Sequence, residues 1–364
     1  NVGTGKTVTI TSSYTGADVS NYSVTDQSST TANITAKALT VSGITASSKT
    51  YDGSTSATLD STSVTYTGLL SGDTFTGSYS GVFANANVGS GKTVNITSSY
   101  SGADSGNYSV TDQSSTTADI STKALTATAS TSNKTYDGAT TASTTLTFSG
   151  LVGTETLGQT VGSTFDNKNV GSNKTVSVNS ITLADGTNGG LAANYSISAG
   201  QTTIAHISPK SLTVSGNTAS NKTYDSNSVA TVTVTLSGFV GSETLTYTNS
   251  SSFNNKNVGT GKTVTVDSIT LADGTNGGLA SNYLVIPGQT TTANITAKAL
   301  TVSGITASSK TYDGSTSATL DTSSVLYSGL ISGDTFNGSY TGAFSNANVG
   351  TGKTVTITSS YTGA

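Results

Sequence analysis

The chain has 364 residues, a formal net charge of −4 and a charged fraction of only 9 %. Its 15 basic residues are scattered lysines. No basic cluster is therefore available to neutralise phosphates, which argues against a nucleic-acid partner. No apolar run reaches the 18 residues of a membrane-spanning helix, and cysteine is absent, which excludes disulfides. Low net charge together with many β-branched residues favours packed strands over disorder.

Three short phrases recur with a period near 87 residues. Lys-Thr-Tyr-Asp begins at Lys49, Lys134, Lys222 and Lys310; Asn-Val-Gly begins at Asn1, Asn87, Asn169, Asn257 and Asn348; Asn-Tyr begins at Asn21, Asn107, Asn194 and Asn282. Solenoid and propeller units span only about 20 to 50 residues. A period near 87 residues instead indicates small domains that each close their own core.

The phrases divide the chain into consecutive repeats. Residues 1–36 are predicted to be the C-terminal part of one repeat, residues 37–122, 123–209 and 210–297 to be complete repeats, and residues 298–364 to be the N-terminal part of another. Residues 30–60 recur letter for letter at 291–321, which is a distance of three repeats. Residues 1–17 likewise match 348–364. We therefore expect the chain to be a window on a longer, recently duplicated array.

Within a repeat, apolar and polar residues alternate with a period of two. Taken along the chain, the alternation is carried by Leu39 and Val41, Val64 and Tyr66, Val94 and Ile96, Tyr108 and Val110, and the run from Thr231 to Leu236. Such alternation is typical of strands with one buried face. Between these runs lie the turn-forming segments 71–73, 87–91 and 185–186. About seven short strands per repeat predict an all-β, immunoglobulin-like sandwich.

The connections between repeats show a change of register. Apolar residues change from even to odd positions between Ile34 and Leu39, and similar slips separate Ile120 from Leu125 and Ile207 from Leu212. A shift of one residue sends a side chain to the other face of a strand. We interpret the slips as points where the chain leaves one sandwich and enters the next without a flexible spacer. The repeats are then predicted to join end to end as a stiff rod, each adding roughly 35–45 Å.

The ordered set of phrases resembles a known family. The phrases are, in order, Lys-Thr-Tyr-Asp-Gly, then Gly-Leu-x-x-Gly-Asp or Gly-Leu-Val-Gly-Thr-Glu, then Asn-Val-Gly and Asn-Tyr-Ser. The set resembles the YDG and MBG-type bacterial immunoglobulin-like repeats, and the resemblance extends over all repeats. The resemblance implies tandem modules of giant secreted or surface-anchored adhesins of the filamentous haemagglutinin type. It implies a structural role outside the cell and no catalysis.

The Tyr-Asp phrase supplies the signature residues, which are Tyr51, Asp52, Gly53, Tyr136, Asp137, Gly138, Tyr224, Asp225, Tyr312, Asp313 and Gly314. We expect the tyrosine to pack into the sandwich and the aspartate to accept backbone N–H bonds in a turn. Ser226 replaces the glycine in one repeat, so the turn there is predicted to differ in type.

Other candidate sites carry weaker signals. Asp185 and Asp273, each in an Asp-Gly-Thr-Asn-Gly-Gly loop, could offer oxygens to calcium, but one carboxylate per loop is few for this cation. The lone His206 has no partner for a zinc site or a catalytic triad and is predicted to face solvent. Gly5-Lys6-Thr7 and its copies lack the spacing of a phosphate loop and are predicted to form a hairpin turn.

A lysine–asparagine isopeptide bond is a further alternative. Lys49 or Lys92 would form it with Asn85, Asn87 or Asn107 beside the carboxylate of Asp73. The ordinary reading is that lysine occupies turns and strand edges.

The sequence favours a structural stalk in a bacterial extracellular adhesin, located at the cell surface or in the secreted matrix, with a role in attachment or biofilm formation. Its partners are then neighbouring repeats, with other copies in a fibre as an option, and no cofactor is expected. A self-assembling filament or sheath subunit is the first alternative. A glycan- or ice-binding module is the second, which a flat threonine face would support. The sequence does not suggest an enzyme, because no combination of an acid, a base and a nucleophile recurs.

Overall fold

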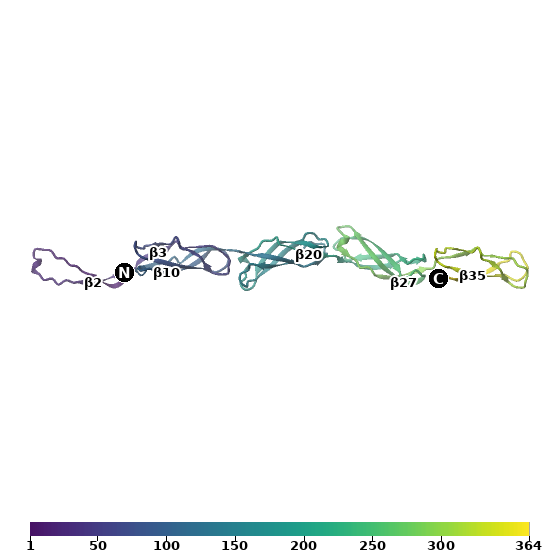
Figure 1. Ribbon diagram of the computed structural model, residues 1–364, viewed down its shortest axis with the longest axis horizontal. Helices are drawn as coiled ribbons and strands as arrows, with labels where there is room; N and C mark the ends of the chain where they lie inside the picture. Colours follow the sequence, from purple (N-terminus) through teal and green to yellow (C-terminus); the bar gives the residue numbers. More distant parts are fainter. Residues whose placement is uncertain (364) are drawn as a thin grey trace. The chain divides into compact units, whose positions relative to one another are not determined.

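The computed structural model describes residues 1–363, which are all-β with short 3-10 turns and no α-helix (Figure 1). This confirms the predicted class. The chain forms two compact units: residues 1–132, 141–166 and 175–205 make unit 1, and residues 133–140, 167–174 and 206–364 make unit 2. The division runs through the predicted repeat 123–209, so each unit is described by itself.

The first part of unit 1 covers the predicted segments 1–36 and 37–122. Its elements are β1 (Gly3–Thr9), η1 (Val19–Asn21), β2 (Ser29–Ile34), β3 (Lys37–Ser42), β4 (Thr45–Ala46), β5 (Lys49–Thr50), β6 (Ser56–Ala57), β7 (Leu59–Asp60), β8 (Thr65–Thr67), β9 (Thr76–Phe83), β10 (Gly89–Ser101), η2 (Ser105–Asn107), β11 (Tyr108–Thr111) and β12 (Ser115–Ser121).

The predicted repeat 123–209 contributes to both units. Its elements are β13 (Lys123–Ala124), β14 (Thr126–Thr131), β15 (Lys134–Thr135), β16 (Thr144–Ser149), β17 (Leu157–Phe165), β18 (Gly171–Asp185), η3 (Ala192–Asn194), β19 (Tyr195–Ser196) and β20 (Thr202–Ser208). Antiparallel pairing joins β14 to β16 in unit 1, and parallel pairing joins Lys134 of β15 to Ile207 of β20 in unit 2.

The rest of unit 2 repeats the same order of strands. Its elements are β21 (Lys210–Ser211), β22 (Thr213–Ala219), β23 (Lys222–Thr223), β24 (Val229–Ala230), β25 (Val232–Ser237), β26 (Leu245–Phe253), β27 (Gly259–Asp273), η4 (Ala280–Asn282), β28 (Tyr283–Leu284), β29 (Thr290–Thr296), β30 (Thr301–Ser303), β31 (Thr306–Ala307), β32 (Ser317–Ala318), β33 (Leu320–Asp321), β34 (Leu326–Ser328), β35 (Asn337–Phe344) and β36 (Val355–Thr362).

Two sheets pack together within residues 37–122. One has the strand order β5-β12-β10-β9-β6 and the other β11-β3-β8. Leu39 and Val41 of β3 are buried against Ile96 and Tyr100 of β10, while the alternate residue Thr40 is exposed. The predicted alternation therefore does place one face of β3 in a core. Burial of apolar side chains between the layers supplies the main driving force for this packing.

Residues 210–297 in unit 2 have the corresponding arrangement. The five-stranded sheet is ordered β23-β29-β27-β26-β24, and β22 pairs with β25 beside it. Val232 and Val234 of β25 pack with Phe253 of β26 and with Val264 and Val266 of β27. The same alternation therefore produces the same kind of core.

The Asn-Val-Gly-x-Gly phrase differs from its predicted structure. The connection between β9 and β10 ends at Val88, and the glycines that follow lie inside β10, where the pairing with β12 has a bulge between Gly89 and Lys92. Gly91 adopts a left-handed φ of 59°, and Asn173 adopts 53° at the corresponding position. The prediction of a hairpin turn at these glycines is wrong, because a left-handed residue here makes a bulge that lets the strand continue.

Consecutive repeats follow one another directly. In unit 1, β12 ends at Ser121 and β13 begins at Lys123; in unit 2, β20 ends at Ser208 and β21 begins at Lys210. One residue therefore separates the last strand of one repeat from the first strand of the next. Among residues 1–363, no helix has the length and apolar character needed to span a bilayer.

Candidate functional site

Two of the recurring phrases meet in unit 1, where the predicted repeat 37–122 joins 123–209. Tyr51, from the Tyr-Asp phrase, is 4 % exposed, and its hydroxyl donates to Oε1 of Glu155 at 2.6 Å. Tyr195, from the Asn-Tyr phrase of the next repeat, donates to Oε2 of the same carboxylate at 2.5 Å. The two rings pack edge to face with centroids 5.4 Å apart. One carboxylate thus binds tyrosines from two consecutive repeats.

The Asn-Val phrase closes the same joint. The Val88 N–H donates to Oδ1 of Asn194 at 2.9 Å, and Nδ2 of Asn194 donates to Oδ1 of Asn87 at 3.1 Å. Asn194 is only 1 % exposed, so both ends of its amide are satisfied by the preceding repeat. A buried amide with both partners in place fixes geometry, because losing either partner leaves a desolvated polar group.

An apolar cluster surrounds these polar contacts. It includes Phe83, Val94 and Ile120 from one repeat together with Leu125 and Tyr195 from the next. The interpretation of the register slip was therefore incomplete: Ile120 and Leu125 lie on either side of the slip, yet both enter one shared cluster instead of two separate cores. Consecutive repeats in unit 1 are joined by a common hydrophobic core.

The joint recurs in unit 2 with the same chemistry. Tyr136 and Tyr283 donate to the two oxygens of Glu243, each at 2.7 Å, and their rings lie 5.5 Å apart. The Val170 N–H donates to Asn282, whose side chain in turn donates to Asn169. This joint also has a cation that its counterpart lacks.

The added cation is Lys168, whose Nζ lies 2.9 Å from Oε1 of Glu243 and 6.0 Å from the centre of the Tyr136 ring. Burial alone raises the pKa of the Glu243 carboxyl, but hydrogen bonds from Tyr136, Tyr283 and Lys168 outweigh burial and leave this pKa below its ordinary value. The carboxylate, which is 6 % exposed, therefore stays charged and paired.

The pKa values of the tyrosines shift in the opposite direction, upward. Burial and then the hydrogen bond to Glu155 raise the pKa of Tyr51 to about 12, and burial, aided by Glu243, raises the pKa of Tyr283 to about 12. A second negative charge beside a buried carboxylate is unfavourable, so these hydroxyls remain protonated donors.

A third joint in unit 2 uses a shorter acid. The Tyr224 hydroxyl donates to Oδ1 of Asp334 at 3.1 Å, and the Ser226 hydroxyl donates to the same oxygen at 3.2 Å. Asp73 in unit 1 occupies the equivalent position in its own repeat, and the Tyr108 hydroxyl donates to its Oδ2. Sequence reasoning missed the role of four acids as acceptors for these tyrosines, namely Glu155, Glu243, Asp73 and Asp334; it had named Asp73 only for an isopeptide bond. The available signal was their recurrence at the same place in each repeat, directly after Gly for the aspartates and after Gly-Thr or Gly-Ser for the glutamates.

The aspartate after each tyrosine organises a local turn. Oδ1 of Asp52 accepts from Nζ of Lys49 and from the Ser54 N–H, both at 2.8 Å. Asp137, Asp225 and Asp313 accept in the same way, which is the turn role predicted for them. Hydrogen bonding from Lys310 and then from Ser315 lowers the pKa of Asp313 to about 2.

The turn at Ser226 does not differ in type from the others. Its φ is 68°, against 77° at Gly53, 79° at Gly138 and 75° at Gly314. The predicted difference is therefore wrong. A serine is held in the left-handed region at this position, where its hydroxyl bonds to Asp334.

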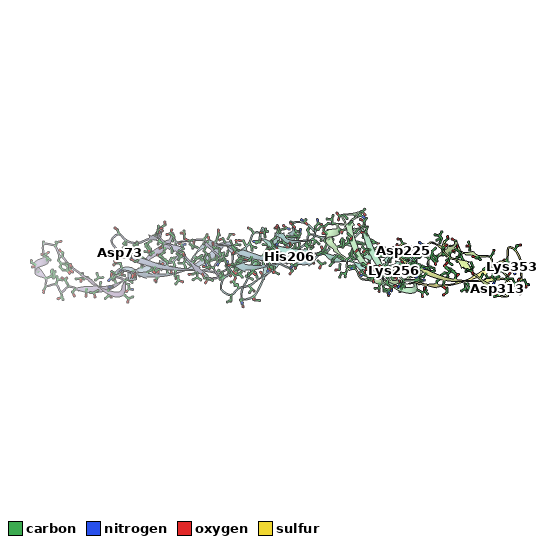
Figure 2. All side chains as sticks on the ribbon, turned by 45° about the vertical axis from the view of Figure 1, so that its right-hand side comes forward. Asp73, His206, Asp225, Lys256, Asp313 and Lys353 are labelled. Carbon is green, nitrogen blue, oxygen red and sulfur yellow. The ribbon has the colours of Figure 1, made fainter. Side chains whose placement is uncertain are left out.

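The last repeat presents the same signature without a following repeat in this sequence. Tyr312 is 64 % exposed, whereas Tyr51 and Tyr136 are buried. Asp313 and Lys353 lie in this repeat (Figure 2). Tyr51 packs in a cluster that combines Phe83 and Val94 of its own repeat with Leu125 and Tyr195 of the next, so the predicted packing into the sandwich was incomplete: the next repeat also covers the tyrosine.

The remaining candidates have local roles. Oδ1 of Asp185 accepts the Ala192 N–H at 2.8 Å, and Asp273 accepts the Ala280 N–H at 2.7 Å. Residues 1–363 contain no group of three or more His, Cys, Asp or Glu side chains able to hold a metal ion. His206 is exposed, and its Nδ1 accepts the Asn173 N–H at 3.1 Å, as Oδ1 of Asp119 does for Gly91.

The structure does not gather the set proposed for an isopeptide bond. Nζ of Lys92 lies 2.7 Å from Oδ1 of Asn85, but Lys49 pairs with Asp52. Asp73 is bound by Tyr108, and Asn87 and Asn107 belong to different joints. The lysines therefore serve as hydrogen-bond donors within turns.

An all-β chain whose recurring phrases line the joints between successive copies is a modular tandem-repeat protein. The family model of the YDG domain matches residues 35–118, 121–204, 208–293 and 296–364. The chain belongs to the YDG domain family. Among curated proteins, no match to the chain was found.

Proposed function

We propose that the chain is a stalk segment of an extracellular bacterial adhesin, in which docked repeats hold a distal binding region away from the cell surface. The supporting observation is that its recurring phrases converge on joints. In unit 1, Tyr51, Asn87 and Asn194 all contribute to one joint, and in unit 2 Tyr136, Asn169 and Asn282 do the same. A spacer requires junctions of defined geometry between its repeats and does not require a ligand-binding pocket.

The material properties of the joints fit this mechanical role. In unit 1 the buried rings of Tyr51 and Tyr195 lie in an apolar cluster shared by two repeats, and one residue separates the strands of successive repeats. Charged hydrogen bonds of this kind contribute about 1.5–3 kcal/mol each when well placed. Bending such a joint would expose both apolar surface and paired polar groups, so we expect resistance to bending.

Electron microscopy of the purified chain tests the stalk proposal. Isolated, thin, unbranched particles with a length proportional to repeat number are expected. Ordered thick fibres formed by lateral association would contradict it and favour the filament alternative. Immunogold labelling of intact producing cells tests location, since label confined to the cytoplasm would contradict an extracellular role.

One observation favours glycan or ice binding as a second candidate function. On β14 and β16, Thr126, Thr128 and Ser130 lie opposite Ser149, Thr147 and Thr145, and all six are exposed. Residues opposite one another share a face of the sheet, so these six form an exposed array of hydroxyls on one face. Retention on insoluble polysaccharide or on ice, lost in Thr128→Lys/Thr147→Lys, would support this candidate. Absence of retention by the unmodified chain would contradict it.

A further inference from the structure

In the three joints described above, the residue after Tyr-Asp and the acid of the next repeat vary together. The residue after Tyr-Asp is Gly53 where the acid of the next repeat is Glu155, and Gly138 where that acid is Glu243. It is Ser226 where the acid is Asp334. The two joints with glycine thus have the longer acid, and the joint with serine has the shorter one.

Geometry explains why glycine accompanies glutamate. A Cβ at Gly53 would lie 2.8 Å from Cγ1 of Val152, and a Cβ at Gly138 would lie 2.7 Å from Cγ1 of Val240. A side chain at either glycine therefore fits only if the valine of the next repeat shifts. In these joints each glutamate oxygen already has a tyrosine donor.

In the third joint the acid is shorter, and one of its hydrogen-bond donors is a serine. Aspartate is one methylene shorter, and its Oδ1 accepts from both Tyr224 and Ser226. Nζ of Lys256 lies 3.4 Å from Oγ of Ser226, and Figure 2 places Lys256 close to Asp225 in the neighbouring turn. The serine hydroxyl therefore supplies the shorter acid with an additional donor.

We propose that these two positions form a matched pair that determines which repeat can follow which. A repeat that carries Tyr-Asp-Gly accepts a following repeat that carries glutamate, and a repeat that carries Tyr-Asp-Ser accepts a following repeat that carries aspartate. The order of repeat types along an array is then encoded at the joints, whether or not the array serves as a stalk.

A double-variant cycle on the full chain tests the pairing, with Ser226→Gly, Asp334→Glu and the two combined. Hydrogen exchange is followed in peptides covering 223–227 and 330–335. Each single change breaks the match, by removing a donor or by pressing a longer acid against the serine. We expect exchange at the joint to rise about tenfold in each, the effect of losing one hydrogen bond to a charged group. The combined variant recreates the glycine–glutamate joint and should exchange within about twofold of the parent.

Gly314→Ser is the matched control, because Gly314 has the same left-handed φ and a Cβ added there would meet no other atom within 4 Å. It should leave exchange in peptide 223–227, which lies across the joint, unchanged. The reciprocal variant Gly53→Ser/Glu155→Asp should likewise be closer to the parent than either of its single changes. Additive effects in both cycles, or single variants that exchange like the parent, would overturn the pairing.

Discussion

At the scale of single residues, the joint depends on a carboxylate that two tyrosines share. Glu155 receives one hydroxyl from each of two consecutive repeats, and Glu243 does the same in unit 2. Each hydroxyl is buried and has a charged acceptor, which is among the stronger hydrogen bonds in proteins. The tyrosine of the Tyr-Asp phrase is thus a docking residue, while the aspartate beside it shapes the turn that presents it.

Glycine in this turn has two separable roles, which substitution can distinguish. Gly138→Ala should destabilise its joint by about 1–3 kcal/mol more than Gly314→Ala destabilises the last repeat, because only the first alanine meets a neighbouring side chain. Both should carry the cost of about 1 kcal/mol for alanine in the left-handed region. Denaturant unfolding followed by hydrogen exchange provides the comparison. Equal effects at the two positions would show that the close approach to Val240 is unimportant.

The raised tyrosine pKa values predict a loss of joint stability at high pH. Tyr51 has a pKa of about 12 in the folded chain against 10.0 for a free tyrosine, so its protonated form stabilises the folded state. That contribution is fully present below pH 10 and is lost as the pH rises from 10 to 12. The stability advantage of the parent over Tyr51→Phe, measured by denaturant midpoint, should therefore be constant up to pH 10 and then shrink. An advantage independent of pH would be inconsistent with this assignment.

At the scale of elements, the strands were predictable and the joint was not. Strict alternation around Leu39 and Val41 reports burial directly, because side chains of a strand alternate between faces. The partner of Tyr51 lies 104 residues away, in the next repeat, so no local pattern could identify it. The register slip between Ile120 and Leu125 marked the position of the joint without showing that both residues share one cluster.

The shared cluster predicts that stability is coupled across the joint. Leu125→Ala should raise hydrogen exchange in the cores of both 37–122 and 123–209, because Leu125 packs with Phe83 and Val94 of the preceding repeat. Leu146→Ala removes a side chain that is equally buried but lies outside that cluster, and should affect only its own repeat. Each change should cost about 2–5 kcal/mol. If Leu125→Ala leaves the preceding repeat unchanged, the joint does not couple its neighbours.

At the scale of the whole molecule, tandem YDG repeats with docked joints resemble other linear arrays in their energetics. Stability in such arrays is approximately a sum of repeat terms and nearest-neighbour terms. Duplication of whole repeats then extends the molecule without a new fold, provided that each new joint is well matched. Residues 30–60 and 291–321 are identical, which is what copying of a unit together with its joint produces.

The central claim is that the joints keep consecutive repeats docked, and small-angle X-ray scattering of this chain beside its Tyr51→Ala/Tyr136→Ala/Tyr224→Ala variant tests it most directly. The parent should scatter as a stiff rod in which each repeat adds roughly 35–45 Å to the maximum dimension. The triple variant should show a smaller radius of gyration with its individual repeats still folded. Identical scattering from the two proteins, or a parent that scatters as freely hinged repeats, would contradict the claim.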